Sequence, residues 1–382
     1  MRFKLSFLFA FFALCSIVSC SDSSDDGPSS NNYGKIPTDN LRDVIKIEYK
    51  NGGAPVITNP NEDEVKVDLT GEHIVVTIDI DTTTHKEYNL EVSGATTNGS
   101  LKIYGEYKIG LYLNGVSITN PKGPAINIQN GKKISVHLGS ENYLTDGVIY
   151  DDPVGEEQAK GTFFSEGQLV FSGESGYLEV RGKRGHAIVT DDYFKIESGT
   201  IKIPEAAKDG IHSNDTLFIE GGNLDIKSIG DGLQSERDAV AISGGNITIN
   251  VSGNGSKGIK ANTSVIIRKG TIGITTSGAK STTAEDTSSV AGIKAKNNIE
   301  MHDGDLKVVS SGKGGKGISA DEDINIRGGK VDITANDDAI KTNRNLTISG
   351  GDITVRSSQK KNPIDCDGKE DIKIKITSTG KP

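Results

Sequence analysis

Most of the chain after His186 repeats one pattern of hydrophobic and polar positions with a period of about 22 residues. Aliphatic and polar residues alternate in short runs, as in Leu217-x-Ile219 and Leu224-x-Ile226. Alternation with a period of two is typical of β-strands that have one buried face. Four segments superpose without gaps in this frame: HAIVTDDYFKIESGTIKI, DGIHSNDTLFIEGGNLDIKS, KGISADEDINIRGGKVDITA and DAIKTNRNLTISGGDITVRS.

Three columns of the repeat describe its geometry. A large aliphatic residue stands two positions into each cycle, at Ile188, Ile211, Leu233, Ile259, Ile293, Ile318, Ile340 and Ile364. A small residue follows two positions later, at Thr190, Ser213, Ser235, Ala261, Ala295, Ala320, Thr342 and Cys366. A glycine column marks a backbone bend that a side chain would obstruct, at Gly199, Gly222, Gly245, Gly270, Gly304, Gly329 and Gly351.

The repeat predicts an all-β fold, a parallel β-helix with three short strands and three bends in each coil. Like residues of successive coils then stack about 4.8 Å apart, which is the spacing between paired strands. We expect this β-helix domain to span residues 101–382, with less regular coils at its start. Residues 43–100 are expected to form an N-terminal β cap and the first strands, which would hide the open edge of the solenoid.

The N-terminus carries a targeting segment. Residues 1–19 have a basic start and an apolar run from Leu5 to Val18, too short to span a bilayer and typical of a signal peptide. The sequence IVSC resembles the bacterial lipoprotein processing box, which implies that Cys20 is lipidated. Residues 20–42 are expected to form a flexible acidic tether, similar to the export tags of surface lipoproteins in the Bacteroides group. This resemblance implies a surface-exposed lipoprotein of the bacterial outer membrane; the alternative is an ordinary cleaved signal peptide.

The formal net charge of −9 limits the possible partners. It argues against a nucleic-acid backbone or an anionic membrane as the main partner, so membrane contact is expected through the N-terminal lipid only. After processing, Cys366 would be the single cysteine of the body, and no disulfide can form within one chain. We expect a monomer.

Several segments together resemble a known family. The segments GLYLNGVSITN, GPAINIQNGKK, FFSEGQLVFSG, HAIVTDDYFKI and DGIHSNDTLFIEGGNL resemble a bacterial carbohydrate-binding domain family built on a right-handed parallel β-helix. The likeness runs from about residue 75 to the end of the chain. It implies a fold similar to that of pectate lyases. It also implies a calcium-bearing cell-surface protein that binds acidic plant polysaccharides such as polygalacturonate, and also cellulose.

An acid-rich patch is our candidate for the calcium site. Asp209 and Asp231 occupy one column, so their carboxylates are expected roughly 5 Å apart on the outer surface. Because stacked like charges are unfavourable, a cation between them would stabilise the pair. Ca²⁺ takes six to eight oxygen ligands. The predicted ligands are Asp191, Asp209, Asn214, Asp215, Asp231 and Glu236. The alternative is that solvent and neighbouring lysines screen these carboxylates.

Further along the axis the same columns become basic. The predicted polysaccharide-binding residues are His212, Lys257, Lys260, Lys294, Lys296, Lys316, Lys341 and Arg344. Cations at one end of the face and ammonium groups at the other suit a polyuronate, whose carboxylates recur along an extended chain. The alternative is charge pairing between coils, such as Lys257 over Asp231 and Asp338 over Lys316. The absence of Trp disfavours a platform for neutral sugars.

The sequence therefore predicts a non-catalytic carbohydrate-binding protein that holds an acidic polysaccharide with calcium. A polysaccharide lyase is the first alternative, with calcium near Asp209 and Asp231 and with Lys260 or His212 as the base. The open surface offers little of the burial that a neutral lysine needs. An adhesin or structural solenoid with a protein partner is the second alternative.

Overall fold

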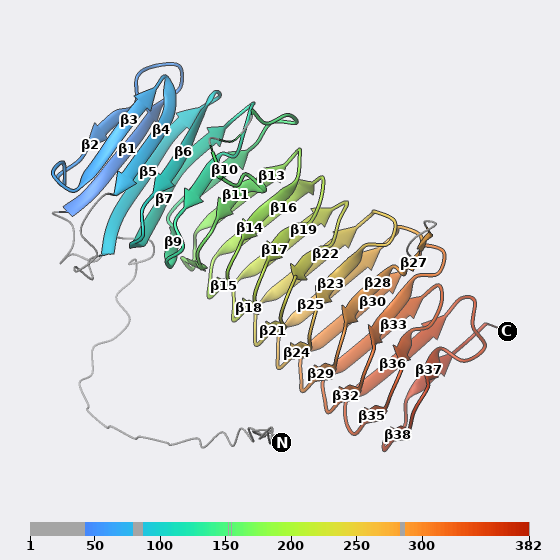
Figure 1. Ribbon diagram of the computed structural model, residues 1–382. Helices are drawn as coiled ribbons and strands as arrows, with labels where there is room; N and C mark the ends of the chain where they lie inside the picture. The colour runs from blue at the N-terminus through green and yellow to red at the C-terminus, as the bar shows by residue number, and fades with distance from the viewer. Residues whose placement is uncertain (1–42, 79–86, 152, 154, 283–286, 382) are drawn as a thin grey trace, which may run out of the picture. The chain divides into compact units, whose positions relative to one another are not determined.

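The computed structural model describes residues 43–78, 87–151, 153, 155–282 and 287–381 (Figure 1). The predicted signal peptide, lipidated Cys20 and tether lie outside the described residues. All sheets of the described part are built from short strands, arranged in one 24-stranded, one 13-stranded and one two-stranded sheet. No described segment is a helix of the length and apolarity needed to span a membrane.

The 13-stranded sheet takes one strand from each successive coil. All its pairings are parallel except that of β3 with β4, which is antiparallel. Its strands are β3 (Val65–Thr70), β4 (Glu72–Ile78), β6 (Gly99–Tyr104), β8 (Ile126–Gln129), β11 (Gly161–Ser165), β14 (His186–Thr190), β17 (Ile211–Ser213), β20 (Leu233–Ser235), β23 (Lys257–Ala261), β28 (Ala291–Ala295), β31 (Lys316–Ala320), β34 (Ile340–Thr342) and β37 (Ile364–Cys366).

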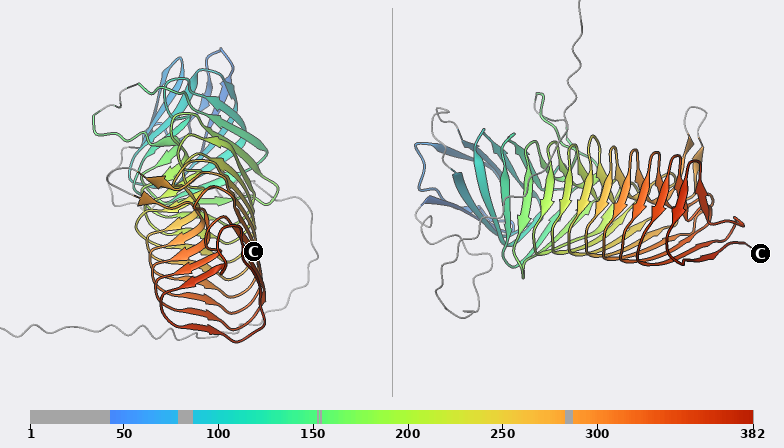
Figure 2. Two further views of the ribbon diagram at one scale, coloured as in Figure 1. Left: turned by 90° about the vertical axis from the view of Figure 1, so that its right-hand side faces the viewer. Right: turned by 90° about the horizontal axis from the view of Figure 1, so that it is seen from below.

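The 24-stranded sheet contains two further parallel ladders, which Figure 2 shows beside each other along successive coils. One ladder consists of β9 (Ile134–Leu138), β12 (Leu169–Ser172), β15 (Phe194–Ile196), β18 (Leu217–Ile219), β21 (Val240–Ile242), β24 (Val265–Ile267), β29 (Ile299–Met301), β32 (Ile324–Ile326), β35 (Leu346–Ile348) and β38 (Glu370–Ile372). The other consists of β10 (Glu141–Thr145), β13 (Tyr177–Gly182), β16 (Thr200–Ala206), β19 (Asn223–Ser228), β22 (Asn246–Val251), β25 (Thr271–Thr276), β30 (Asp305–Ser310), β33 (Lys330–Ala335), β36 (Asp352–Ser357) and β39 (Thr377–Thr379).

The first strands join the two ladders. Strand β7 (Lys108–Thr119) is long enough to pair with both β9 and β10, and β5 (Glu87–Thr96) pairs with β7 in parallel. Strand β1 (Val44–Lys50) pairs with β5 in parallel and with β2 (Val56–Thr58) antiparallel. The small third sheet is a hairpin of β26 (Ser281–Thr282) and β27 (Thr287–Ser288). The described chain is therefore an all-β, parallel β-solenoid of about 12 turns.

The aliphatic column of the repeat forms the centre of the core. Its members pair in register from coil to coil and point inward, from Ile188 with Ile211 to Ile340 with Ile364. Those from Ile188 to Ile340 are at most 1% exposed. Burial of each such side chain contributes about 1.5–3 kcal/mol. The interior is therefore what holds the coils in the register that the sequence predicts.

The glycine column has the backbone conformation that its residue type suggests. All seven members, from Gly199 to Gly351, have positive φ, between 76° and 117°, which favours glycine over residues with a Cβ. The small column differs at its end. Its last member, Cys366, is only partly buried, with its Sγ 3.2 Å from the Arg344 carbonyl oxygen. The reason is that β37 is the last strand of the 13-stranded sheet, so no described strand covers it on that side.

Candidate functional site

One outward-facing row of the 13-stranded sheet carries four of the eight predicted polysaccharide-binding residues, which are His212, Lys260, Lys294 and Lys341. Its members face the same way because each is the second-to-last residue of its strand and pairs in register with its neighbours. The row runs through Val189, His212, Gln234, Lys260, Lys294, Ser319, Lys341 and Asp365. We call it the outer row.

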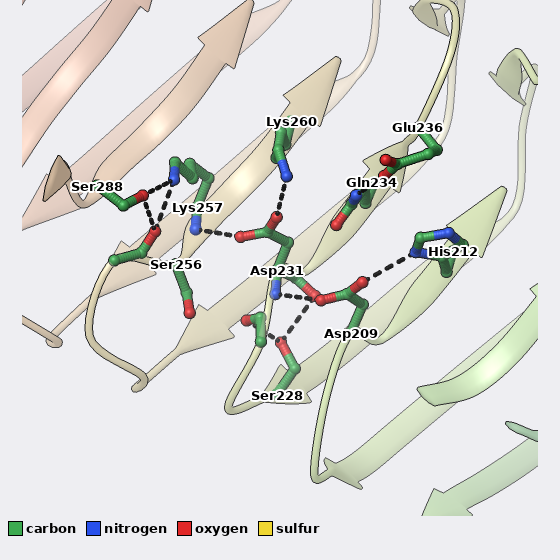
Figure 3. A network of polar contacts seen from close by, with 12 residues as sticks. Asp209, His212, Ser228, Asp231, Gln234, Glu236, Ser256, Lys257, Lys260 and Ser288 are labelled. Atoms are coloured by element: carbon green, nitrogen blue, oxygen red, sulfur yellow. Dashed lines mark hydrogen bonds and ion pairs between the residues drawn. The ribbon is translucent and has the colours of Figure 1, made fainter. Parts of the chain in front are cut away.

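The column before the outer row connects coils through side-chain to main-chain hydrogen bonds. Asp209 Oδ1 accepts a hydrogen bond of 2.7 Å from the backbone N–H of Asp231. Asp231 Oδ1 in turn accepts one of 2.6 Å from the backbone N–H of Lys257 (Figure 3). The two aspartates therefore lie in adjacent coils, and each carboxylate binds the main chain of the next coil.

The burial of these aspartates corrects the prediction of a surface acid pair. Asp209 and Asp231 are each only 7% exposed. Gly210 and Gly232 follow them, and a Cβ at either position would lie 2.4 Å from a core isoleucine methyl group. Because glycine permits this close approach, the Asp-Gly pairs draw the backbone against the core and take the carboxylates inward.

The two carboxylates have opposite pKa shifts. Burial would raise the pKa of Asp209, but the imidazole rings of His186 and His212 beside it hold the pKa well below its usual value. Burial and the nearby Asp209 carboxylate raise the pKa of Asp231, against the opposing effect of Lys260. The two aspartates therefore have different electrostatic surroundings, although they occupy one column.

The remaining predicted calcium ligands lie closer to solvent. Asp191 Oδ1 accepts hydrogen bonds from Asn214 Nδ2 at 3.0 Å and from Lys160 Nζ at 2.6 Å. Glu236 accepts a short hydrogen bond from Gln234, and Asp215 lies 4.0 Å from Arg237. Asn214 Oδ1 and one carboxylate oxygen each of Asp191 and Glu236 accept no hydrogen bond from any described residue.

The predicted basic residues fall into two groups. Those that form ion pairs are Lys260 with Asp231 at 3.5 Å, Lys294 with Asp321, Lys341 with Asp365 at 3.1 Å and Asp367 at 2.8 Å, and Arg344 with Glu322 at 3.8 Å and Asp323 at 4.0 Å. Within the described chain, Lys296 and Lys316 form no ion pair within 4.0 Å. The pairs of Lys294 and Arg344 are partly exposed and contribute about 0–1 kcal/mol each, so a ligand carboxylate can replace the internal partner there, whereas Lys260 pairs with the buried Asp231.

Lys257 differs from the predicted charge pairing. Its backbone N–H binds Asp231 Oδ1. Its Nζ donates hydrogen bonds of 2.6 Å to the Gly255 carbonyl oxygen and to Ser288 Oγ (Figure 3). The predicted pair of Asp338 with Lys316 is also replaced, because the ammonium group within 4.0 Å of Asp338 belongs to Lys360.

Three residues of the site were absent from the predicted set. His186 contacts Asp209, Gln234 lies in the outer row and is 7% exposed, and Lys160 pairs with Asp191. His186 stands in the same column as Asp209 and Asp231, so the repeat alone could have identified it. Lys160 lies upstream of the regular repeat, in a connection whose path the periodicity does not predict.

Comparison with known proteins finds a solved structure and a protein family that are similar to this chain. A solved structure titled as a polysaccharide lyase-like protein from C. thermocellum, in a gadolinium derivative, is similar with a TM-score of 0.54 and 26% identity. The match covers 61% of this chain and 92% of that one.

A carbohydrate-binding domain-containing protein of Acetivibrio thermocellus is 31% identical over 110 residues, which are 27% of this chain. The match spans only 38% of that relative's length. The family model for carbohydrate-binding domain-containing proteins matches residues 72–315 and 309–378, which is most of the chain. The protein therefore belongs to the carbohydrate-binding domain-containing protein family.

Proposed function

We propose that the protein is a non-catalytic binder of acidic polysaccharide, and that the glycan lies along the outer row. The observation that carries the proposal is the register of Lys260 with Lys294 in adjacent coils, with Lys341 two coils further. Paired strands are about 4.8 Å apart, so the ammonium groups recur along the solenoid axis. A polyuronate laid along this axis presents its carboxylates in the same direction, and each can form a charge-assisted hydrogen bond.

Calcium is the second part of this proposal. Asp209 and Asp231 do not fit a calcium site, because N–H groups, imidazole rings and Lys260 already engage their oxygens. Asp191, Asn214 and Glu236 each offer an oxygen that accepts no hydrogen bond from a described residue, with Asp215 beside them. Calcium takes six to eight oxygens, so water and glycan carboxylates would supply the others.

The binding test uses immobilised polygalacturonate and the purified protein. We expect retention that weakens with salt, because exposed charge pairs are screened. The double variant Lys260→Gln with Lys294→Gln should lose at least about tenfold in affinity, or about 1.4 kcal/mol. The matched control carries Lys195→Gln and Lys307→Gln, in β15 and β30 outside the outer row. Equal retention of both double variants would contradict a binding site on the outer row.

The calcium test is separate from the glycan test. A native-state ligand raises the melting temperature, so calcium should stabilise the protein and EDTA should reverse the effect. The variant Asp191→Asn with Glu236→Gln should lose most of this response, whereas Asp303→Asn on an exposed turn should keep it. A calcium response that is the same in both variants would place the ion elsewhere.

A lyase is the second candidate, because the solved neighbour is titled polysaccharide lyase-like. β-Elimination needs a base at carbon five of the uronate and a cation on its carboxylate. Incubation with polygalacturonate, followed by the absorbance of unsaturated product, separates the two candidates. Product that disappears in Lys260→Ala would establish the lyase and overturn the non-catalytic proposal.

For the whole protein we propose a surface-exposed lipoprotein of the bacterial outer membrane, anchored through Cys20. Its body would be a monomeric, right-handed solenoid with three strands in each coil and a cap at its first strands. Radiolabelled fatty acid should enter the wild-type protein in bacteria and fail to enter Cys20→Ser. Labelling of the Cys20→Ser variant would exclude this anchor.

A further inference from the structure

A second cluster of side chains includes one residue of the outer row, His212, and is rich in nitrogen. It consists of His186 from β14, Asp209 from the turn before β17, and His212 from β17. Potential ligand atoms of the three residues all lie within 4.8 Å of one another. Figure 3 shows His212 and the Asp209 carboxylate directed toward each other. This cluster serves neither the calcium site nor the lysines described above.

The contacts within the cluster bring three electron-rich atoms together. Asp209 Oδ2 lies 3.1 Å from His186 Nδ1 and 3.0 Å from His212 Nδ1. His186 Nδ1 also accepts a hydrogen bond of 3.2 Å from the backbone N–H of Asp209. In the tautomer that accepts this bond, His186 Nδ1 carries a lone pair beside Oδ2 and has no proton to donate to it. The nitrogen lone pair and the carboxylate oxygen then repel each other, and a cation bound by both atoms removes this repulsion.

The dimensions suit a small divalent metal ion. Zinc binds imidazole nitrogen at about 2.0–2.1 Å and carboxylate oxygen at about 2.0–2.2 Å, so neighbouring ligand atoms lie roughly 3 Å apart. The two nitrogen–oxygen separations in the cluster match this spacing. The ion would take the place of the 3.2 Å N–H contact at His186 Nδ1, which is the longest hydrogen bond of the group.

The surroundings hold the carboxylate ready for such an ion. Asp209 Oδ1 is fixed by the backbone N–H of Asp231, which leaves Oδ2 directed at the two rings. Outer hydrogen bonds of this kind orient metal ligands and strengthen binding. The side chains are 10–17% exposed, so further coordination positions reach solvent.

We propose that His186, Asp209 and His212 bind one divalent transition-metal ion of the zinc class, through two imidazole nitrogens and one carboxylate oxygen. Imidazole is a ligand for zinc, copper, iron and nickel, whereas calcium prefers an all-oxygen shell. Water, or a carboxylate of a bound glycan, completes the coordination. The inference stands independently of the proposed function, because metal binding is measured without any polysaccharide.

The test uses tag-free protein that has been treated with EDTA and dialysed. Titration calorimetry with zinc chloride should show one equivalent bound, and excess calcium chloride should not compete. Cobalt chloride should produce visible absorption bands that zinc abolishes. His186→Gln and His212→Gln should each weaken zinc binding at least about tenfold. The matched control is His302→Gln, a partly exposed histidine that contacts Glu300 and Arg327 in later coils.

Two results would overturn the inference. One is the absence of saturable zinc binding in the wild-type protein, which would mean that a proton alone bridges the cluster. The other is zinc binding that survives both cluster substitutions or falls equally in His302→Gln. Melting curves in EDTA show whether each variant folds. If a variant does not fold, histidine modification of the wild-type protein by diethyl pyrocarbonate decides: zinc must protect His186 and His212 and leave His302 reactive.

Discussion

Asp231 and Asp338 occupy the same column of the repeat, yet their carboxylates have different surroundings. Asp231 Oδ1 accepts an N–H from Lys257 in the next coil, and Oδ2 lies 3.5 Å from Lys260 Nζ. Asp338 is 3% exposed, and its Oδ1 accepts no hydrogen bond within the described chain. Lys360 Nζ lies 3.6 Å from it, beyond hydrogen-bond distance. The column of the repeat determines where a carboxylate lies, whereas the residues of the following coil determine whether its oxygens have hydrogen-bond donors.

The largest effect is expected at Asp209, where the carboxylate has partners on both oxygens. Asp209→Ala leaves the Asp231 N–H unpaired and removes the contacts with both histidines, so the free energy of unfolding should fall by about 3 kcal/mol. Urea unfolding in the presence of EDTA measures this loss without any contribution from metal. Asp303→Ala, at an exposed turn, is the control. A loss below about 1 kcal/mol would show that the coil-to-coil bond carries little stability.

At Asp231 the loss of stability should depend on whether the new side chain keeps a hydrogen-bond acceptor. Asp231→Ala leaves the buried Lys257 N–H without an acceptor, at an expected cost of about 2 kcal/mol. Asp231→Asn keeps a side-chain oxygen for that N–H and removes the repulsion from Asp209. It should therefore cost less than half as much in the same urea experiment. Equal losses would mean that the charge, and not the hydrogen bond, is what stabilises this coil.

At Asp338 the same truncation should have little effect. Asp338→Ala removes an oxygen that has no hydrogen-bond donor, so the free energy of unfolding should change by no more than about 0.5 kcal/mol. The urea midpoint is compared directly with that of Asp231→Ala. If both variants lose the same stability, the contrast between the two coils is wrong.

The smallest expected effect is the pH dependence at Asp338. Burial and the Asp337 carboxylate raise the pKa of Asp338. A raised folded-state pKa stabilises the protein below the ordinary value of about 3.9, and this stabilisation is lost as the pH rises through the raised pKa. The stability of Asp338→Ala relative to wild type should therefore increase between about pH 4 and about pH 7. A difference that stays constant across this interval would exclude the raised pKa.

Much of the fold could be predicted from the periodicity of the chain. Ile211, Leu233 and Ile259 pair in register as the superposed segments require, because the hydrophobic pattern fixes which side chains face the core. The adjacency of Asp209 and Asp231 followed from the same frame. The depth of their carboxylates did not, because it depends on how closely Gly210 and Gly232 approach the core in three dimensions.

The partners of the site residues were harder to predict than their positions. Lys160 reaches the site from the connection before β11, and Ser288 reaches it from the hairpin of β26 and β27; neither segment belongs to the regular repeat. The ion pairs of Lys294 and Lys341 involve Asp321, Asp365 and Asp367, so the later coils are less uniformly basic than their lysine columns suggest. The columns of the repeat predict where each residue lies along the solenoid. They do not predict the side-chain conformation, which determines the residue that each charged group contacts.

The bond from Asp231 Oδ1 to the main chain of Lys257 has a consequence for how such a protein can change over time. Every amino acid except proline supplies that donor, so the next residue of the column can be acidic, as Asp231 is above Asp209, or basic, as Lys257 is above Asp231, without loss of the hydrogen bond. Substitutions in this column can therefore change the charge of the face coil by coil, while the hydrogen bonds that join successive coils remain.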